Sequence, residues 1–318
     1  MGIKTYTTLS FLFATVFTFC QGIEIQRKYL VENPIEFQKF LMENAALNDY
    51  YTYHHADYVY YDLYFDTPEF DLMNNGLSLR MRKKNEGTPE FTYVFQLKSE
   101  METAQGLRME VEEPELDFYM LHYKMSELNL AQLLDTIFYK FENNSSGEFN
   151  FEYEFTALNY WIYYKAEGPI TPFQKLSFLF PHLFNAEKIA SLKPIIIGKS
   201  KRIRNHIYFE NRNSSTQFGT QLTKTIINEN TPLFFIENPE THWLMESSLD
   251  SAVFYPLFPS DKSHLTIFEF ELENKYKEDS LGSWMMNTFE KLLQQKFNIV
   301  NTVNSKYLQS AIAFRGIK

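Results

Sequence analysis

The chain of 318 residues has one cysteine, Cys20, and few glycines and prolines, 11 and 12 respectively. A single cysteine excludes a disulfide framework within the chain, so the stability of the fold depends on its core. The hydrophobic content of 44%, with 21 tyrosines and 31 phenylalanines, supplies that core and favours strands over loops. The composition therefore predicts a large, strand-rich globular protein.

Basic residues are also in deficit, because 30 Lys and Arg residues face 40 Asp and Glu residues and the net charge is −10. This balance excludes a nucleic-acid-binding protein that depends on bulk positive charge. The sequence also lacks a Gly-rich phosphate loop, a Ser/His/Asp arrangement and a Cys/His zinc pattern. Any small anion that the chain binds must therefore be held by a local basic cluster.

Residues 1–22 have the features of a leader, with an early Lys4 and an apolar run from Leu9 to Cys20. This run is too short to span a bilayer and is typical of a secretory signal peptide. Cleavage after Gly22 predicts a mature chain, 23–318, without a membrane span, in a secreted or periplasmic (extracytoplasmic) location. The alternatives are an uncleaved anchor, a buried first strand, or lipid attachment at Cys20, for which the usual small residues before the cysteine are missing.

Hydrophobic periodicity predicts amphipathic helices and two groups of strands. The helices are expected over 33–47, 125–141, 171–192 and 280–297, and the strands over 58–113 and 195–273. Pro181 interrupts the third helix.

Six of the predicted strands alternate between apolar and polar residues, which places their charged and amide side chains on one face. These polar residues are Glu24, Gln26, Lys28, Arg80, Arg82, Gln96, Lys98, Arg108, Glu110, Glu112, Arg202, Arg204, His206, Glu269, Glu271 and Glu273. One explanation is an antiparallel sheet with one face in water. The other is a barrel with the charges inside, where bases hold a polyphosphate and acids hold divalent cations. The pattern alone leaves both open.

The order of these motifs resembles that of the CYTH superfamily, the triphosphate tunnel metalloenzymes. The family opens with Glu-x-Glu-x-Lys, matched here by Glu24-x-Gln26-x-Lys28, and continues with a segment similar to YFDTP and an LRxR strand. A lysine strand, an Arg-x-Glu-x-Glu strand, a basic strand, an aspartate and a late Glu-x-Glu follow in the same order. The resemblance extends from Glu24 to Lys306.

The resemblance implies an α+β fold over residues 23–318, an antiparallel β-barrel tunnel of the eight-strand type with helices packed outside and a helical insertion at about 114–195. It implies phosphate binding by Lys28, Arg80, Arg82, Lys98, Arg202, Arg204 and Lys306. It implies binding of Mg²⁺ or Mn²⁺ by Glu24, Gln26, Glu110, Glu112, Glu269 and Glu271. It also implies catalytic roles for Glu110, Glu112 and Asp250.

The activity implied is divalent-metal-dependent hydrolysis of a triphosphate-containing anion, with inorganic tripolyphosphate as the first choice and nucleoside triphosphates next. Relatives that make polyphosphate or cyclise adenine nucleotides are enzymatic alternatives. One departure matters, because Gln26 stands where the family has an acid and carries no charge. A secreted, non-catalytic polyphosphate-binding module is therefore a further alternative.

Overall fold

The computed structural model describes residues 22–43, 46–47, 50–85, 91–99, 107–113, 130–144, 149–164, 185–209, 222–228, 231–236, 245–274, 279–302 and 304–316. Residues 1–21 of the predicted leader lie outside this set, and Gly22 already begins the first strand. Within the described residues, the helices are all too short or too polar to cross a membrane.

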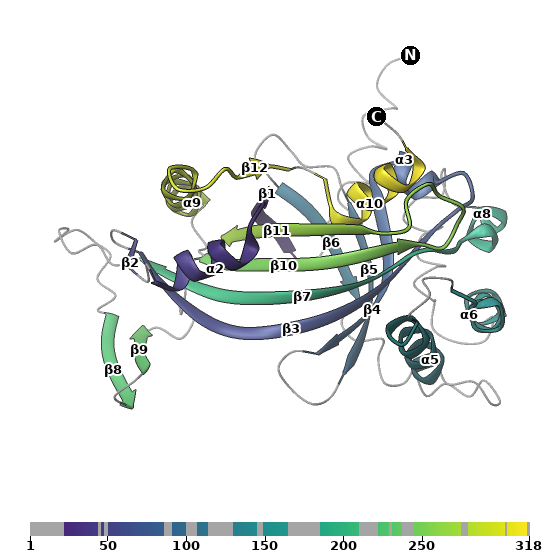
Figure 1. Ribbon diagram of the computed structural model, residues 1–318, viewed down its shortest axis with the longest axis horizontal. Helices are drawn as coiled ribbons and strands as arrows, with labels where there is room; N and C mark the ends of the chain where they lie inside the picture. The colour runs from purple at the N-terminus through teal and green to yellow at the C-terminus, as the bar shows by residue number, and fades with distance from the viewer. Residues whose placement is uncertain are drawn as a thin grey trace, which may run out of the picture.

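The centre of the protein is an antiparallel sheet of ten strands, two of which have only two residues. The eight longer strands lie in the order β11 (Leu265–Asn274), β10 (Met245–Pro256), β7 (Lys193–Phe209), β3 (Tyr50–Asp66), β4 (Leu77–Asn85), β5 (Thr92–Ser99), β6 (Leu107–Glu113) and β1 (Gly22–Leu30). The short strands are β2 (Ala46–Leu47) beside β3 and β12 (Val300–Asn301) beside β1, whereas β8 (Leu222–Asn228) and β9 (Thr231–Ile236) form a separate pair. Figure 1 shows β3, β7, β10 and β11 side by side and curved in the same sense.

Strand β1 lies between the first and the last of the other long strands, β11 and β6, and pairs with them through different residues. It pairs with β6 over residues 22–25 and with β11 over residues 26–30. The prediction of an antiparallel eight-strand sheet with helices outside is therefore confirmed. Because no residue of β1 pairs with both edges, the sheet is not closed along its length, and the closed barrel stays a prediction.

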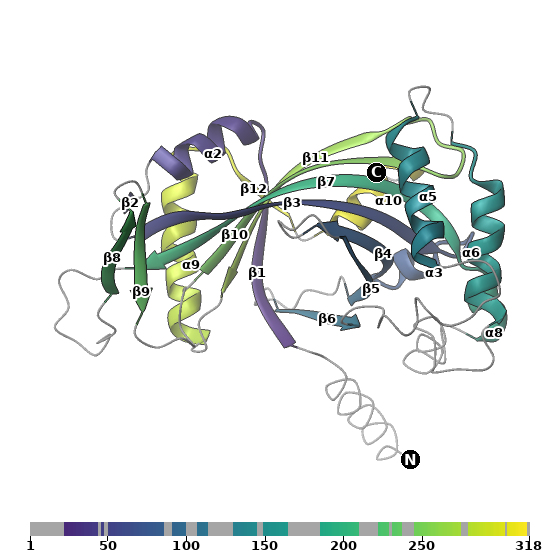
Figure 2. The same cartoon turned by 90° about the horizontal axis from the view of Figure 1, so that it is seen from below.

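The helices cover the sheet at its two ends (Figure 2). At one end lie α2 (Pro34–Glu43) and α9 (Asp279–Gln294), and at the other lie α5 (Leu130–Glu142), α6 (Glu152–Tyr164) and α8 (Ala186–Ser191). Three of the four helices expected from the sequence match α2, α5 and α9. Of the fourth, expected over 171–192, only α8 lies within the described residues. Helix α6 was not predicted, because its many aromatic residues are typical of strands.

One face of the sheet is apolar and packs against these helices. Leu63 and Leu79 of the sheet join Ile137 and Phe138 of α5 in one cluster. At the other end, Leu249 and Phe270 of the sheet join residues of α2 and α9 in a second cluster. The side chains that alternate with these residues form the opposite face, which is defined here as the charged face.

The last helix, α10 (Lys306–Arg315), packs against the charged face instead. Tyr307, Ala311 and Phe314 of α10 lie in a third apolar cluster with residues of β3, β7, β10 and β11. The ring of Tyr307 stacks on that of Tyr64, with 5.1 Å between the ring centroids. The apolar side of α10 therefore covers one end of the charged face and brings its first residue, Lys306, into it.

A buried carboxylate fixes α10 to the YFDTP segment. Asp66 is fully buried and accepts hydrogen bonds from the backbone N–H groups of Thr67, Leu72 and Met73. Leu72 and Met73 belong to the short helix α3 (Asp71–Asn74). The hydroxyl of Tyr307 donates a further hydrogen bond to Asp66 Oδ2 at 2.5 Å. Asp66 therefore links the end of β3 to the helix that carries Lys306.

Replacing Asp66 with alanine is expected to lower the free energy of unfolding by about 3 kcal/mol, because several buried N–H donors lose their acceptor. Tyr307→Phe removes one hydrogen bond and is expected to cost only about 1 kcal/mol. Urea unfolding of the two variants measures this difference. Equal losses would show that Asp66 does little beyond binding Tyr307.

Candidate active site

The strand register places the charged residues of β1, β11, β10 and β7 in neighbouring rows, where a row is a set of residues that lie opposite one another across the strands. Asp250 lies opposite Glu269 on one side and Arg202 on the other. Lys28 lies opposite Glu271, which is two residues along β11 from Glu269. These five side chains thus come from four strands and meet on the charged face.

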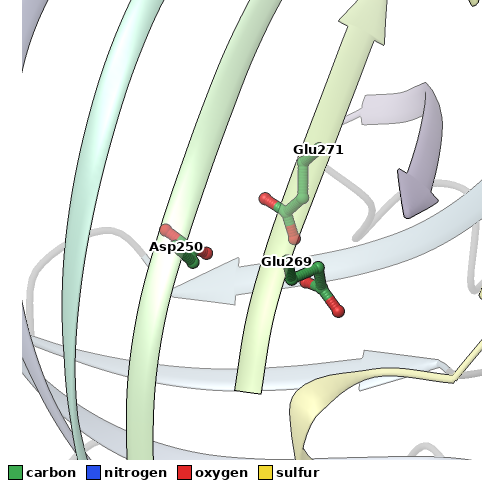
Figure 3. Close-up of side chains that lie close together, drawn as sticks. All are labelled: Asp250, Glu269 and Glu271. Carbon is green, nitrogen blue, oxygen red and sulfur yellow. The ribbon is translucent and has the colours of Figure 1, made fainter. Parts of the chain in front are cut away.

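Three carboxylates, defined here as the acid trio, lie together at this point: Asp250, Glu269 and Glu271 (Figure 3). One oxygen from each lies within 4.8 Å of the others, a spacing that could hold a metal ion. In the structure the ammonium of Lys306 lies among them, 2.7 Å from Asp250 Oδ2, 3.4 Å from Glu271 Oε1 and in contact with Glu269. A cationic side chain therefore neutralises part of the trio.

Two further bases complete this arrangement. Arg202 binds Asp250 through two N–H groups, at 2.7 and 2.6 Å, and Glu271 at 2.5 Å. Lys28 Nζ lies 3.2 Å from Glu271 Oε1. The three acids are thus balanced by three bases, which is what burial of charge requires.

Protonation in the trio follows from these contacts. Burial raises the pKa of Asp250 and Glu271, but Arg202 and Lys306 outweigh it and hold both below their ordinary values. At Glu269 burial prevails over Lys306 and raises the pKa of the carboxyl. Burial lowers the pKa of Lys306, but Asp250 and Glu269 outweigh it and the net shift is upward. Lys306 is accordingly charged at neutral pH.

A second acid–base cluster lies across the sheet on β3 and β4. Asp62 is fully buried and binds Arg82 through both oxygens, at 2.7 and 2.8 Å. Arg80 Nε lies 3.7 Å from Asp62 Oδ1 and donates to Gln96 at 2.6 Å. Its Nη1 donates to the hydroxyl of Tyr64 at 3.1 Å. The two arginines of the LRxR motif are therefore held by partners that restrict their side chains.

Tyr60 connects the two clusters. Its ring centroid lies 4.3 Å from Cζ of Arg82 and 5.5 Å from Cζ of Arg202. Asp62 binds the guanidinium group of Arg82, and Asp250 binds that of Arg202. The contacts run from β4 through β3 and β7 to β10, so the two arginines are fixed relative to each other.

Beyond the trio, the charged face continues in a row that includes Gln26. Gln26 is buried and lies opposite Glu273, which in turn lies opposite Glu246. Glu246 Oε1 is 3.0 Å from Nε of Arg204. Two glutamates therefore lie in the same row as the uncharged Gln26.

For the remaining predicted residues the structure gives backbone positions only. Lys98 on β5 lies opposite Glu110 on β6, and Glu24 on β1 lies opposite Arg108. Glu112 lies opposite Gln96. By strand alternation these positions share the face that carries Arg80 and Gln96.

The structure brings together most of the predicted residues whose side chains it describes. Lys28, Arg202, Asp250, Glu269, Glu271 and Lys306 form one cluster, and Arg80 and Arg82 belong to the second. Gln26 lies in the row beyond the acid trio, and Arg204 contacts Glu246 of that row. Sequence reasoning missed Asp62, Tyr60 and Glu246 as members of the charged face. Tyr60 and Asp62 are two residues apart on the tyrosine-rich strand β3, so the alternation of that strand could have placed both on the charged face.

The buried carboxylates predict a loss of stability in acid. Burial raises the pKa of Asp62, but Arg82 and Arg80 outweigh it and keep the pKa below its ordinary value of 3.8. A group whose pKa is lower in the folded state contributes stability above its unfolded pKa, and this contribution is lost as the pH falls through the folded pKa. Asp250 and Glu271 act in the same direction, whereas Glu269 acts in the opposite one.

We therefore expect the free energy of unfolding to fall as the pH drops below about 4. Asp62→Asn should flatten part of this decline, because the amide cannot be protonated there. Urea unfolding between pH 7 and pH 3 measures the slope, and an unchanged slope in Asp62→Asn would contradict the assignment of the ionised form to Asp62.

One family model and several solved structures are similar to this chain. The model of the CYTH domain family matches residues 22–212. No curated protein matches the chain. Among solved structures, the chain is similar to a Hippeastrum protein described as a candidate adenylyl cyclase with a dominant triphosphatase activity, at 14% identity and a TM-score of 0.45, covering 93% of this chain and 96% of that one.

A candidate adenylate cyclase from Bacillus halodurans is similar at 18% identity and a TM-score of 0.42, covering 90% of this chain and 96% of that one. A protein from Pyrococcus horikoshii is similar at 13% identity and a TM-score of 0.39, covering 90% and 97%. The family assignment rests on the domain model, which matches more than half of the chain. The protein is a member of the CYTH domain family.

Proposed function

We propose that the protein is a divalent-metal-dependent triphosphatase that hydrolyses a triphosphate-containing anion on its charged face, with the strands closed around the anion as a tunnel. Inorganic tripolyphosphate is the first substrate and nucleoside triphosphates are the next. The observation that carries the proposal is the pair of clusters on one face: partly buried arginines are held by carboxylates in both clusters, and in one of them three carboxylates lie close enough together to hold a metal.

The residues fit a hard divalent cation such as Mg²⁺ or Mn²⁺. The acid trio offers carboxylate oxygens, which these cations prefer, within 4.8 Å of one another. A bound cation would neutralise charge on the phosphoryl group that is transferred. Since Lys306 now lies among these oxygens, a metal at the trio requires its ammonium to move away. In this proposal its new partner is the anionic substrate.

The bases of the chain bind the phosphate oxygens in this proposal. Arg80, Arg82 and Arg202 are already oriented by carboxylates, an amide and tyrosines, so that little rotational freedom is lost on binding. Lys28 and Lys306 add point charges. Glu110 and Glu112 are assigned, with Asp250, to positioning the attacking water and the metal. Stabilising charge that develops in the transition state is the main catalytic effect expected here.

A phosphate-release assay with tripolyphosphate and ATP, with Mg²⁺ or Mn²⁺, tests the proposal. We expect release that stops when EDTA is added. Separating the products on gels identifies chain elongation, and an assay for cyclic AMP identifies cyclisation, so both alternatives are read from the same reactions. No product with either anion and either metal would overturn the enzymatic proposal.

A non-catalytic polyphosphate-binding module is the second candidate, and two observations favour it. Gln26 lacks the charge of the family acid, and the ammonium of Lys306 contacts all three members of the acid trio, where a metal would bind. This candidate predicts tight binding of tripolyphosphate without turnover. Gln26→Glu would then restore metal-dependent release, because it adds a third carboxylate to the row of Glu246 and Glu273.

We also propose that the leader directs the chain out of the cytoplasm, on the basis of its apolar run. N-terminal sequencing of the protein secreted by its host tests this. A mature N-terminus near Ile23 supports it, and retention of residues 1–22 contradicts it.

A further inference from the structure

The charged face contains a buried serine hydroxyl without a hydrogen-bond partner among the described residues. Ser200 of β7 is 2% exposed, and its Oγ has no hydrogen-bond partner among the residues that the structure describes. Leaving a buried hydroxyl unpaired costs free energy, so such groups are rare and call for an explanation. A ligand that accepts a hydrogen bond would provide one.

The position of Ser200 indicates which ligand. It lies opposite Tyr60 on β3 and opposite Ala252 on β10. On β7 it is two residues from Arg202, so the two side chains share a face. Tyr60 contacts the guanidinium groups of both Arg202 and Arg82. The hydroxyl therefore shares the charged face with two arginines, in the row of the tyrosine that links them.

The charges around Ser200 favour an anion over a cation. Two carboxylates lie nearby, and both already have partners. Asp62 accepts two hydrogen bonds from Arg82, and Asp250 accepts two from Arg202. Arg82, Arg202 and Ser200 can all donate hydrogen bonds to a ligand. Three donors of this kind suit the oxygens of a phosphate group.

We propose that Ser200 is a substrate-binding residue whose hydroxyl donates to a phosphate oxygen held by Arg82 and Arg202, and that Tyr60 is the positioning residue that fixes the two guanidinium groups. The proposal rests on the proposed function, because it assigns a subsite within the same face. The ligand class is a polyphosphate anion.

The chain provides a matched control in Ser247 of β10. Its Oγ is also buried and without a hydrogen-bond partner among the described residues. Ser247 lies opposite Leu272 and alternates with Ser248, so it shares the apolar face with Met245 and Leu249. Ser200→Ala and Ser247→Ala therefore remove the same group from opposite faces of the sheet.

Isothermal titration calorimetry with tripolyphosphate, together with thermal unfolding of the free protein, tests the proposal. Ser200→Ala is expected to lower the affinity about tenfold, the effect of losing a hydrogen bond to a charged group. The same change should leave the melting temperature of the free protein equal or higher, since it removes an unpaired hydroxyl. Ser247→Ala should leave the affinity unchanged.

Wild-type affinity in Ser200→Ala, with the wild type binding normally, would overturn the assignment and leave the proposed function standing. A wild type that binds no tripolyphosphate would overturn both. Equal losses of affinity in Ser200→Ala and Ser247→Ala would show a general effect on the sheet, and this result would also overturn the assignment of Ser200.

Tyr60 is tested by a pair of variants. Tyr60→Phe keeps the ring and should retain affinity for tripolyphosphate, because the contact with the guanidinium groups is made by the ring face. Tyr60→Leu should weaken binding about tenfold and raise KM more than it lowers kcat. Equal affinity of the Phe and Leu variants would overturn the positioning role.

Discussion

Lys306→Met is expected to tighten the binding of Mn²⁺ and to weaken the binding of tripolyphosphate, each by about tenfold or more. The ammonium lies among the carboxylates that would bind the metal, so its loss removes a competing cation from Asp250, Glu269 and Glu271. The same loss removes one positive charge from the surroundings of the anion. Methionine keeps a similar length and fills the buried space.

Calorimetry with Mn²⁺ alone and with tripolyphosphate alone separates the two effects. Lys201→Met is the control, because Lys201 is exposed and adjacent to Arg202 on the opposite face of β7. Weaker binding of both ligands in Lys306→Met would contradict the competition. It would indicate that the lysine mainly maintains the structure of the site.

Glu271→Gln is expected to lower turnover of tripolyphosphate by about a thousandfold, in the range seen when a group that stabilises the transition state is removed. The change removes the charge of a carboxylate proposed to bind the metal and leaves Arg202 and Lys28 with one anionic partner fewer. Without metal, binding of tripolyphosphate should therefore be equal or tighter. Phosphate release and calorimetry measure the two quantities.

The control for Glu271→Gln is Glu152→Gln, which makes the same chemical change on the exposed surface of α6 and should leave turnover unchanged. Loss of both binding and turnover in Glu271→Gln would indicate misfolding or a role in binding. Full turnover would contradict the assignment of Glu271 to the metal.

The alternation of polar and apolar residues predicted that the charged residues of each of six strands share one face. Polar residues recur at every second position of the strands that carry Arg80, Arg202 and Glu271, which places them on one face of each strand. The structure joins these strands in a single sheet. Which rows meet could not be predicted, because register depends on turns and on packing at a distance. Only the register brings Asp250 beside Glu269 and Glu271 rather than beside Glu273.

The contribution of α10 could not be derived from periodicity. Its approach to the charged face depends on Tyr307, which binds Asp66 from a segment far away in the sequence. Lys306 was predicted as a phosphate ligand by resemblance, but its position among the acids follows from this packing. In the same way, Asp62 and Ser200 carry no motif of their own and are identified by burial and by their partners, or lack of one.

We propose that the charged face binds a triphosphate and, with a divalent metal, cleaves it. Both steps are measured by calorimetric titration of tripolyphosphate into the purified protein, with and without Mg²⁺ or Mn²⁺, with phosphate release followed in the same samples. We expect binding in both conditions and release only with metal. Absence of binding in both conditions would contradict this function, and binding without release under either metal would leave the protein a polyphosphate-binding module.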